Sequence, residues 1–407
     1  MIGNLLRALI GLLMACAFAL AAFIAGYVVQ QTSAPAPAAA VATPGPARSP
    51  SAQSSAESDF AVFWEAWTIV KAEFIGTLPD AKKLTYGAIA GVVDTLGDQH
   101  THFDEPERAE ILQSDLNGSF EGIGATVDIK NNQIIVVDPL KGRPAEAAGV
   151  QSGDIILKID GVSTDGMSLT EAVARIRGPK GTKVTLTIGR TGSAQPLEIT
   201  ITRATIQVDV VTQRPLDNGL VYLQLTEFTA PSSKTVDDAL QELMKSNPKG
   251  LVFDLRGNPG GFLSSAVEVG SEFVGDGLIL SERDKDGNLT PHPALPGGRA
   301  TKIPLVVLVD KGTASASEIV AGAIRDHGRG ILVGEKTFGK GSVQVSDTLS
   351  DQSHLTITIR HWLTPKGTDI HGNGLDPDIP VPFNEADKKA GRDPQLERAV
   401  EFLLTGK

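Results

Sequence analysis

The chain has 407 residues, with 37 Lys and Arg against 48 Asp and Glu, and a formal net charge of −11. This acidic balance argues against nucleic acid as a partner, because phosphate backbones select basic surfaces. Cys16 is the only cysteine, which excludes a disulfide framework and a cysteine nucleophile in the rest of the chain. No Walker-type phosphate loop occurs, so we expect neither ATP use nor another cofactor.

Residues 8–30 form an uncharged apolar segment that is long enough to span a bilayer. Arg7 precedes it, which favours a cytoplasmic N-terminus and an exported remainder. We therefore expect a transmembrane signal anchor within residues 1–30. The protein would be a single-pass protein of the cell membrane, with its folded part on the extracytoplasmic (periplasmic or extracellular) side. A cleaved signal peptide, or a lipid anchor on Cys16, is the alternative.

Residues 31–57 are rich in Pro, Ala and Ser and poor in large apolar residues, which predicts a disordered, partly extended linker. Residues 58–111 predict an N-terminal helical region, whose first segment is typical of a core or a subunit interface. Its aromatic side chains recur near helical spacing at Phe60, Phe63, Trp64, Trp67 and Phe74.

Two histidines lie close together in the segment GDQHTHF, residues 97–103. His100 and His102 could suggest a metal, but no third ligand stands at a convincing spacing. We therefore expect no metal site here and a structural role for this segment.

Residues 112–205 contain GIGATV, PAEAAGVQSGD and SLTEAVARI, in this order. These segments resemble a PDZ domain, in which a peptide C-terminus adds as a strand beside the domain's own edge strand and a helix. The resemblance implies that backbone N–H groups of one loop hold the peptide carboxylate, and glycines let the backbone meet the ligand. A PDZ module without a peptide role is the alternative. The loop consists of Glu121, Gly122, Ile123 and Gly124.

Residues 206–385 alternate short apolar runs with helical patterns, which predicts α/β layering. The runs are GLVYLQL, GLVFDL, PLVVLV and ILVGE. The glycine-rich segment DLRGNPGG, residues 254–261, leaves the end of the second run. Residues 386–407 predict a C-terminal amphipathic helix.

Ser315 stands between the run PLVVLV and a helix predicted over residues 316–327. A hydroxyl becomes a nucleophile when a base takes its proton, and a neutral lysine amine can be that base. The helix carries the chain away and ILVGE returns it by a similar length, so Lys340 can lie beside Ser315. Gln344 would point to the same side as Lys340 in an extended chain. The spacing permits a Ser–Lys–Gln cluster.

Each of these residues also has an ordinary structural interpretation. Ser315 and Glu318 match the capping-box pattern of a helix N-terminus. Lys340 could be a solvated loop lysine, and Gln344 a plain strand residue. The residues alone leave both interpretations open.

The segments GTASASE, GEKTFGKGSVQ and DLRGNPGG resemble the signatures of the carboxy-terminal processing peptidases, also called tail-specific proteases. The resemblance runs in order through residues 60–380. It implies that Ser315 is the nucleophile, Lys340 the general base and Gln344 the amide that orients the lysine. A serine-type acyl transfer also needs donors for the oxyanion. These would be the backbone N–H groups of Ala316 and Gly261, the latter preferred over Gly260.

The resemblance implies a crotonase-like, Clp-protease-like α/β core with an inserted PDZ domain, an N-terminal helical region and an N-terminal transmembrane anchor. It implies a membrane-anchored serine endopeptidase that holds the C-terminal tail of a protein substrate and cleaves through an acyl-enzyme. A homo-oligomer or a regulatory adaptor is compatible with this interpretation. The alternative is a catalytically silent PDZ adaptor that binds protein C-termini. The chain departs from the family at Gln99, where proline is common.

Overall fold

The computed structural model describes residues 51–407, which belong to two compact units divided after Pro79. The predicted anchor over residues 1–30, and residues 31–50 of the predicted linker, lie outside the described residues. Among residues 51–407, no helix is both long enough and apolar enough to cross a membrane.

The first unit contains helix α2 (Ser51–Glu73). Residues 51–57 are therefore helical, although they fall in the stretch for which the sequence predicts an extended linker. A helix that is already nucleated propagates readily through Ala, Gln and Glu, which is consistent with helical structure in this stretch. The aromatic side chains of α2 are not buried by the part of the chain that the structure describes, since Phe60 is 55% and Trp64 61% exposed.

The second unit is built around a six-stranded sheet in the order β10-β11-β12-β15-β16-β19. Its strands are parallel except for the antiparallel pair β10–β11. The two central strands are buried at every position, as expected for a parallel sheet covered on both faces. The bounds are β10 (Val211–Pro215), β11 (Leu220–Leu225), β12 (Gly250–Asp254), β15 (Leu305–Val309), β16 (Ile331–Gly334) and β19 (Ile379–Pro380).

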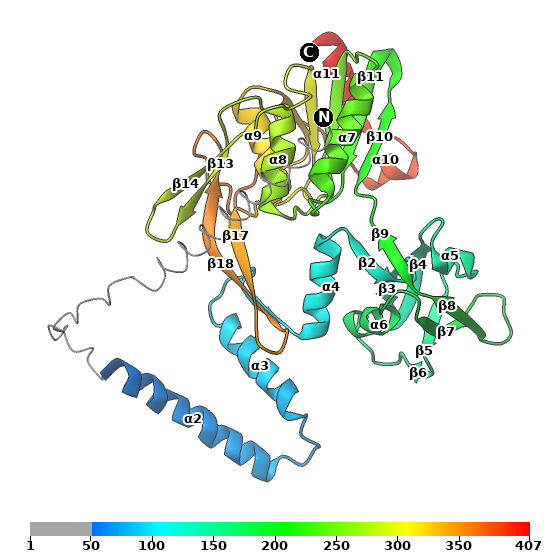
Figure 1. Ribbon diagram of the computed structural model, residues 1–407, viewed down its shortest axis with the longest axis vertical. Coiled ribbons are helices and arrows are strands. Elements are labelled where there is room, and N and C mark those ends of the chain that lie inside the picture. Colours follow the sequence, from blue (N-terminus) through cyan, green and yellow to red (C-terminus); the bar gives the residue numbers. More distant parts are fainter. Residues whose placement is uncertain (1–50) are drawn as a thin grey trace, which may run out of the picture. The chain divides into compact units, whose positions relative to one another are not determined.

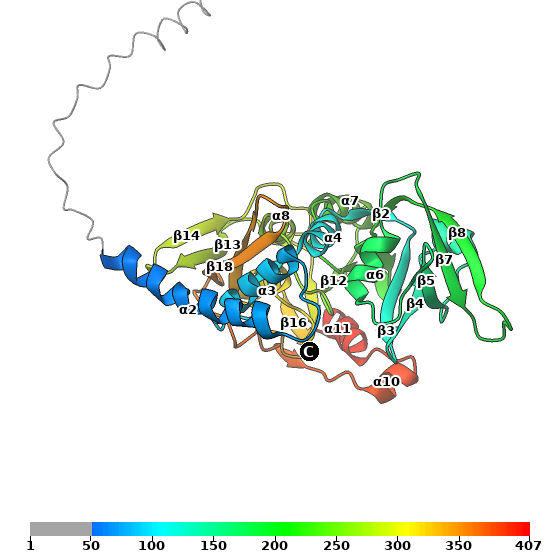
Figure 2. The same ribbon diagram turned by 90° about the horizontal axis from the view of Figure 1, so that it is seen from below.

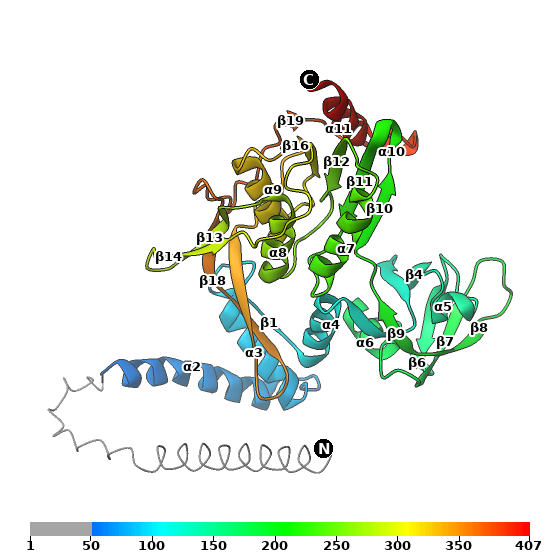
Figure 3. The ribbon, with the colours of Figure 1, turned by 45° about the horizontal axis from the view of Figure 1, so that its top comes forward.

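Helices cover both faces of this sheet (Figures 1 and 3). One apolar core joins the sheet to α7 (Ser232–Met244), α8 (Leu263–Phe273) and α9 (Ala316–Asp326). A second, smaller core joins its other face to α11 (Pro394–Thr405). The single C-terminal helix predicted over residues 386–407 is thus two helices, since α10 (Glu385–Lys389) ends before Pro394. A 3₁₀ turn, η1 (Asp217–Gly219), precedes β11.

A smaller sheet in the order β1-β18-β13-β14 stands beside this core. Strand β17 also pairs with β18, and the pairing shifts between Val343 and Gln344, which marks a β-bulge. The bounds are β1 (His102–Asp104), β13 (Leu278–Asp284), β14 (Leu289–Pro293), β17 (Ser342–Thr348) and β18 (His354–Leu363).

Before the PDZ-like domain, the second unit has α3 (Ala81–Asp94) and α4 (Pro106–Leu116), followed by the ribbon β2 (Ser119–Gly122) with β9 (Ala204–Gln207). The domain itself is a sheet in the order β3-β4-β5-β7-β8 with α6 packed on it (Figure 2). Ser168 caps α6, since its hydroxyl accepts the N–H of Glu171. The bounds are β3 (Ala125–Lys130), β4 (Gln133–Pro139), α5 (Pro144–Ala147), β5 (Ile155–Ile159), β6 (Val162–Ser163), α6 (Leu169–Ile176), β7 (Lys183–Gly189) and β8 (Leu197–Thr202).

Candidate active site

Two loops meet at one edge of the core sheet. One follows β12 and the other follows β15, and because these strands are parallel neighbours their carboxyl ends lie side by side. Asn258 joins the loops, since its carbonyl oxygen accepts the N–H of Ala314 and the hydroxyl of Ser317, each at 3.0 Å. Its side-chain amide donates to the carbonyl of Leu225 at 2.8 Å. The two segments picked out by sequence are thus one rigid layer.

Ser315 has an unusual backbone conformation, with φ 55° and ψ −118°. Non-glycine residues rarely adopt a positive φ, and such strain persists only where the surroundings over-determine it. The residue sits directly before the first turn of α9, on a sharp strand-to-helix turn. A strand-to-helix turn of this kind is also found at nucleophile elbows, and here Ser315 and Glu318 form the predicted capping box at the start of α9.

Glu318 is the central buried group of the site. It has no exposed surface, and one of its oxygens, Oε2, accepts the N–H of Ser315 and the N–H of Lys340, each at 2.9 Å. Its other oxygen accepts the N–H of Gly339 at 2.8 Å and the hydroxyl of Thr337 at 2.5 Å. The helix-capping glutamate therefore also fixes the lysine loop, and brings the backbones of Ser315 and Lys340 together.

Lys340 is largely buried and has no ion pair or side-chain hydrogen bond within residues 51–407. Burial lowers the pKa of its amine below the ordinary value, while the nearby carboxylate of Asp98 opposes this shift. A lowered pKa is what a lysine needs to be neutral and act as a base. No hydrogen bond between the described residues joins the Ser315 hydroxyl to this amine.

Two backbone N–H groups near Ser315 have no acceptor within residues 51–407, those of Ala316 and Gly261. The N–H of Gly260 instead donates to Oδ1 of Asn258 at 2.9 Å. Gly260 packs so closely that a Cβ there would lie 2.8 Å from the Cβ of Ser315, which explains the glycine. The backbone N–H groups that remain available as donors beside Ser315 are therefore those of Ala316 and Gly261.

Gln344 lies at the β-bulge of β17, and its side chain does not contact Lys340 through a hydrogen bond. Its amide nitrogen donates to the hydroxyl of Ser342 at 2.9 Å and to that of Thr358 at 3.1 Å. Both amide hydrogens are therefore used, while the carbonyl oxygen has no partner within residues 51–407. The sequence gives no sign of Thr358 in this position.

The candidate carboxylate loop of the PDZ-like domain spans the end of β2 and the start of β3. Glu121 and Gly122 belong to β2, Ile123 is buried, and Gly124 has φ +73°. The N–H groups of Ile123 and Gly124 have no acceptor among the described residues. A Cβ on Gly124 would lie 2.5 Å from the Cβ of Arg143, so only glycine fits.

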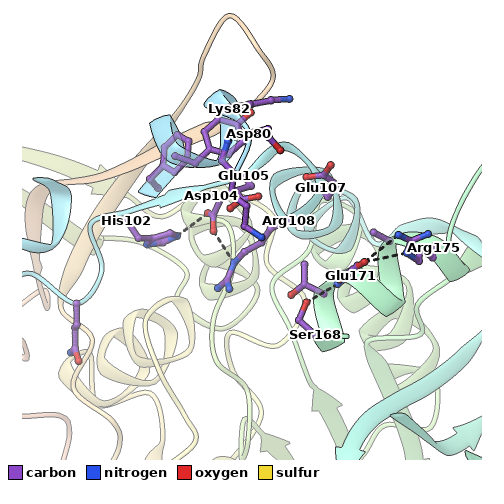
Figure 4. A pocket seen from close by; sticks show the side chains of 16 residues that line it. Asp80, Lys82, His102, Asp104, Glu105, Glu107, Arg108, Ser168, Glu171 and Arg175 are labelled. Carbon is purple, nitrogen blue, oxygen red and sulfur yellow. Dashed lines mark hydrogen bonds and ion pairs between the residues drawn. The ribbon is translucent and has the colours of Figure 1, made fainter. Parts of the chain in front are cut away.

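An open cleft of about 1230 Å³ lies between α6 and the segment from α3 to α4 (Figure 4). Its walls are mostly charged. On one side Asp104 accepts from Arg108 at 2.7 Å and faces His102 at 3.0 Å, and on the other Glu171 accepts from Arg175 at 3.1 Å. Ser315 and Lys340 do not line the cleft. It leads from the PDZ-like helix to β1, which pairs with β18.

Sequence reasoning missed two residues that hold the site together. Glu318 carried a signal, the capping-box pattern, but only for its contact with Ser315. Asn258 lies within the segment DLRGNPGG, but nothing local shows its contacts with Leu225 and Ser317, which lie more than 30 residues away along the chain. Within residues 51–407 no three potential His, Cys, Asp or Glu ligands gather as a metal site.

Comparison with known proteins identifies two families. Residues 219–381 match peptidase family S41, and residues 112–189 match the PDZ domain. The carboxy-terminal processing protease CtpA of Bacillus subtilis (strain 168) is 38% identical over 344 residues, which cover 82% of this chain and 73% of that protein. A carboxy-terminal-processing protease of Bartonella bacilliformis is 39% identical over 351 residues, covering 85% and 80%.

A solved structure of a candidate S41 protease from Bacteroides fragilis is similar in fold, with a TM-score of 0.50 at 19% identity. The alignment covers 78% of this chain and 87% of the Bacteroides fragilis chain. The extent and identity of the two curated relatives decide the assignment. The chain belongs to peptidase family S41, and it is a carboxy-terminal processing serine peptidase with a PDZ domain.

Proposed function

We propose that this chain is a membrane-anchored endopeptidase in which Ser315 is the nucleophile and Lys340 the general base. The observation that carries the proposal is the shared Glu318 carboxylate, which accepts the backbone N–H of both residues. Two residues that are 25 positions apart are thereby held at one sheet edge. The strained backbone of Ser315 and the lowered pKa of Lys340 give additional support.

In the proposed reaction, the Oγ of Ser315 attacks the carbonyl carbon of the scissile bond and its proton passes to the amine of Lys340. The N–H groups of Ala316 and Gly261 bind the oxyanion as it forms. Lys340 then gives the proton to the leaving amine, and an acyl-enzyme remains on Ser315. A water that loses its proton to Lys340 hydrolyses this ester. The carbonyl oxygen of Gln344 orients the lysine during these steps.

The substrate is proposed to be a protein held by its C-terminal tail. Its terminal carboxylate would bind the free N–H groups of the loop Glu121, Gly122, Ile123 and Gly124, and its last residues would add beside β3 and α6. The charged cleft between α6 and β1 would give a chain that leaves the PDZ-like domain a path toward β1, which pairs with β18. Addition of a strand beside β3 requires an extended segment, so we expect unfolded tails as substrates.

Residues 8–30 are proposed to anchor the chain in the cell membrane, with the catalytic part on the extracytoplasmic side and residues 31–50 as a tether. The uncharged apolar run and the preceding Arg7 support this location. The core is proposed to be of the crotonase-like, Clp-protease-like type. The exposed aromatic side chains of α2 are compatible with a homo-oligomer or a regulatory adaptor as a further partner.

The proposal is tested by reacting the full-length chain in detergent with a fluorophosphonate, which modifies activated serines. We expect one modified residue, Ser315, identified by peptide mass spectrometry, and loss of labelling in Lys340→Ala. The labelling rate should fall as the pH falls through the pKa of Lys340, because a protonated amine cannot accept the serine proton. Burial lowers that pKa, so the midpoint should lie below the ordinary value of 10.5.

Labelling of another serine, or an unchanged rate in Lys340→Ala, would refute the assignment. A chain that binds tails without any labelling would instead be the silent PDZ adaptor.

Tail binding is tested separately with Gly124→Val. A valine strains the backbone at φ +73° and places its Cβ against Arg143, so the carboxylate loop must move. We expect at least a roughly 10-fold weaker affinity for a fluorescent peptide with an apolar C-terminus, measured by anisotropy. Gly142→Val is a matched control, since Gly142 also has a positive φ of 71° but open space around its Cβ. Equal weakening in both variants would exclude a specific role for the loop.

A further inference from the structure

The turn before β1, residues 98–101, has no role in the proposed reaction, although its Asp98 lies close enough to Lys340 to affect the pKa of the lysine. Its centre is Asp98, whose carboxylate accepts the hydroxyl of Thr101 at 2.7 Å and the N–H of His100 at 3.1 Å. The hydroxyl of Thr358 in β18 forms a further hydrogen bond to Asp98. The backbone N–H of Thr358 also donates to the hydroxyl of Thr101 at 3.0 Å. The turn is thus bonded to the middle of β18.

These contacts determine the direction of the hydrogen bonds. Burial alone would raise the pKa of Asp98, but the hydrogen bonds from Thr358, Thr101 and His100 lower it to about 2. Asp98 is therefore ionised at neutral pH, and an ionised carboxylate can only accept. The hydroxyl of Thr358 must donate its one proton to Asp98, so toward Gln344 it can only accept.

Gln344 must then present its amide nitrogen, not its oxygen, to Thr358. The structure has this arrangement, with the nitrogen 3.1 Å from the hydroxyl of Thr358. The second hydrogen of the same nitrogen goes to Ser342 at 2.9 Å. The two ends of a glutamine amide have nearly the same shape, so only their hydrogen-bond partners can fix which way the group faces. With both hydrogens engaged, the carbonyl oxygen is the end that stays free.

We propose that Thr358, with Asp98 behind it, is a positioning residue that fixes the amide of Gln344 so that its carbonyl oxygen faces the amine of Lys340. The inference rests on the proposed roles of Ser315, Lys340 and Gln344. It adds the residues that allow Gln344 to orient Lys340. The β-bulge contributes, because it places Gln344 opposite Thr358 in the pairing of β17 with β18.

A reversed amide would impair the reaction for a simple reason. Its N–H groups would face a lysine that is itself a donor when protonated, and when neutral they would occupy the lone pair that must take the serine proton. Among the groups that face Lys340, Asp98 and His100 are the titratable ones from this turn. A change in the amide should therefore affect turnover far more than tail binding.

The test compares Thr358→Val with Thr358→Ser in the full-length chain, using a dye-labelled, permanently unfolded protein with an apolar C-terminus. Valine keeps the shape and suits a strand but has no hydroxyl, so Gln344 can reverse. We expect kcat to fall roughly 10- to 100-fold with little change in KM, and Thr358→Ser to recover most of it. Thr356→Val is the matched control, because Thr356 lies two residues away on β18 and donates only to Ser346, at 3.2 Å.

Asp98→Asn provides an independent arm. An asparagine can donate to Thr358, which lets the hydroxyl donate to Gln344 and so favours the reversed amide. We expect kcat to fall as in Thr358→Val although the shape is unchanged. The acid limb of the rate should also move to lower pH, because the loss of the carboxylate removes the charge that stabilises protonated Lys340.

Gln344→Ala separates the positioning role of Thr358 from the proposed role of Gln344 itself. If Thr358 acts through Gln344, the double variant Gln344→Ala/Thr358→Val should lose no more activity than Gln344→Ala. Full activity in Gln344→Ala would refute the proposed role of Gln344 itself. Loss in Gln344→Ala with wild-type kcat in Thr358→Val would refute only the positioning role. Equal losses in Thr358→Val and Thr356→Val would show a general effect of β18 and would also overturn it.

Discussion

Ser315→Ala is expected to reduce cleavage of an unfolded protein by roughly 10⁵- to 10⁶-fold, because the reaction loses its nucleophile and no acyl-enzyme can form. Neighbouring hydroxyls cannot replace it. Ser317 is buried and donates to the carbonyl of Asn258 on the loop after β12. Affinity for a tail peptide should be unchanged, since the carboxylate loop belongs to another domain. Single-turnover cleavage and peptide anisotropy measure the two effects separately.

A matched serine elsewhere provides the control for this result. Ser271→Ala removes a buried hydroxyl from α8 that donates to the carbonyl of Val267 at 2.6 Å and accepts the N–H of Leu295 at 2.8 Å, away from the site. It should cleave at the wild-type rate. Equal cleavage by Ser315→Ala and the wild type would remove Ser315 from the mechanism. The inactive variant also provides a trap, because substrates that it binds in cells should remain uncut and can be identified.

Glu318→Gln is expected to impair both stability and turnover. Each carboxylate oxygen accepts two hydrogen bonds, so whichever end becomes the NH₂ group loses two of them and faces two donors instead. Leaving buried donors unpaired costs about 1–3 kcal/mol each, so the two lost hydrogen bonds predict a loss of roughly 2–6 kcal/mol of unfolding free energy. The loops of Ser315 and Lys340 should separate slightly, and a shift of about 1 Å can cost 10²-fold in rate.

Urea denaturation and cleavage kinetics on the same preparation test this prediction. Glu242→Gln is the control, because Glu242 is exposed on α7 and pairs only with Lys245, and such surface pairs contribute at most about 1 kcal/mol. A Glu318→Gln protein that is destabilised but turns over normally would show that the carboxylate supports the fold alone. A stable and fully active variant would contradict both parts.

The sequence alone points to the residues proposed to react because their signals are local. Ser315 follows an apolar strand and opens a helix, and the return through β16 makes contact with Lys340 geometrically reasonable. The contacts that hold them depend on the fold. Glu318 reaches the N–H of Lys340 from 22 positions away, and Asp98, in the turn before β1, acts on Thr358 in β18. Such pairings leave no local pattern.

The orientation of Gln344 shows a second limit. An extended chain would place Lys340 and Gln344 on one side, but Lys340 precedes β17 and a bulge alters the alternation at Gln344. Helix α2 shows a third limit, since residues 51–57 are helical through propagation from the apolar segment that follows them, although their composition predicts a linker. In each case the missing information is tertiary or cooperative.

The backbone of Ser315 restricts what could ever replace it. At φ 55° a residue branched at Cβ is strongly disfavoured, so threonine, which carries the same hydroxyl, is not an accessible nucleophile at this position. Glycine would relieve the strain and abolish the chemistry. Stability alone would favour glycine at this position, whereas the proposed catalysis requires serine, so the two requirements act in opposite directions on this one residue.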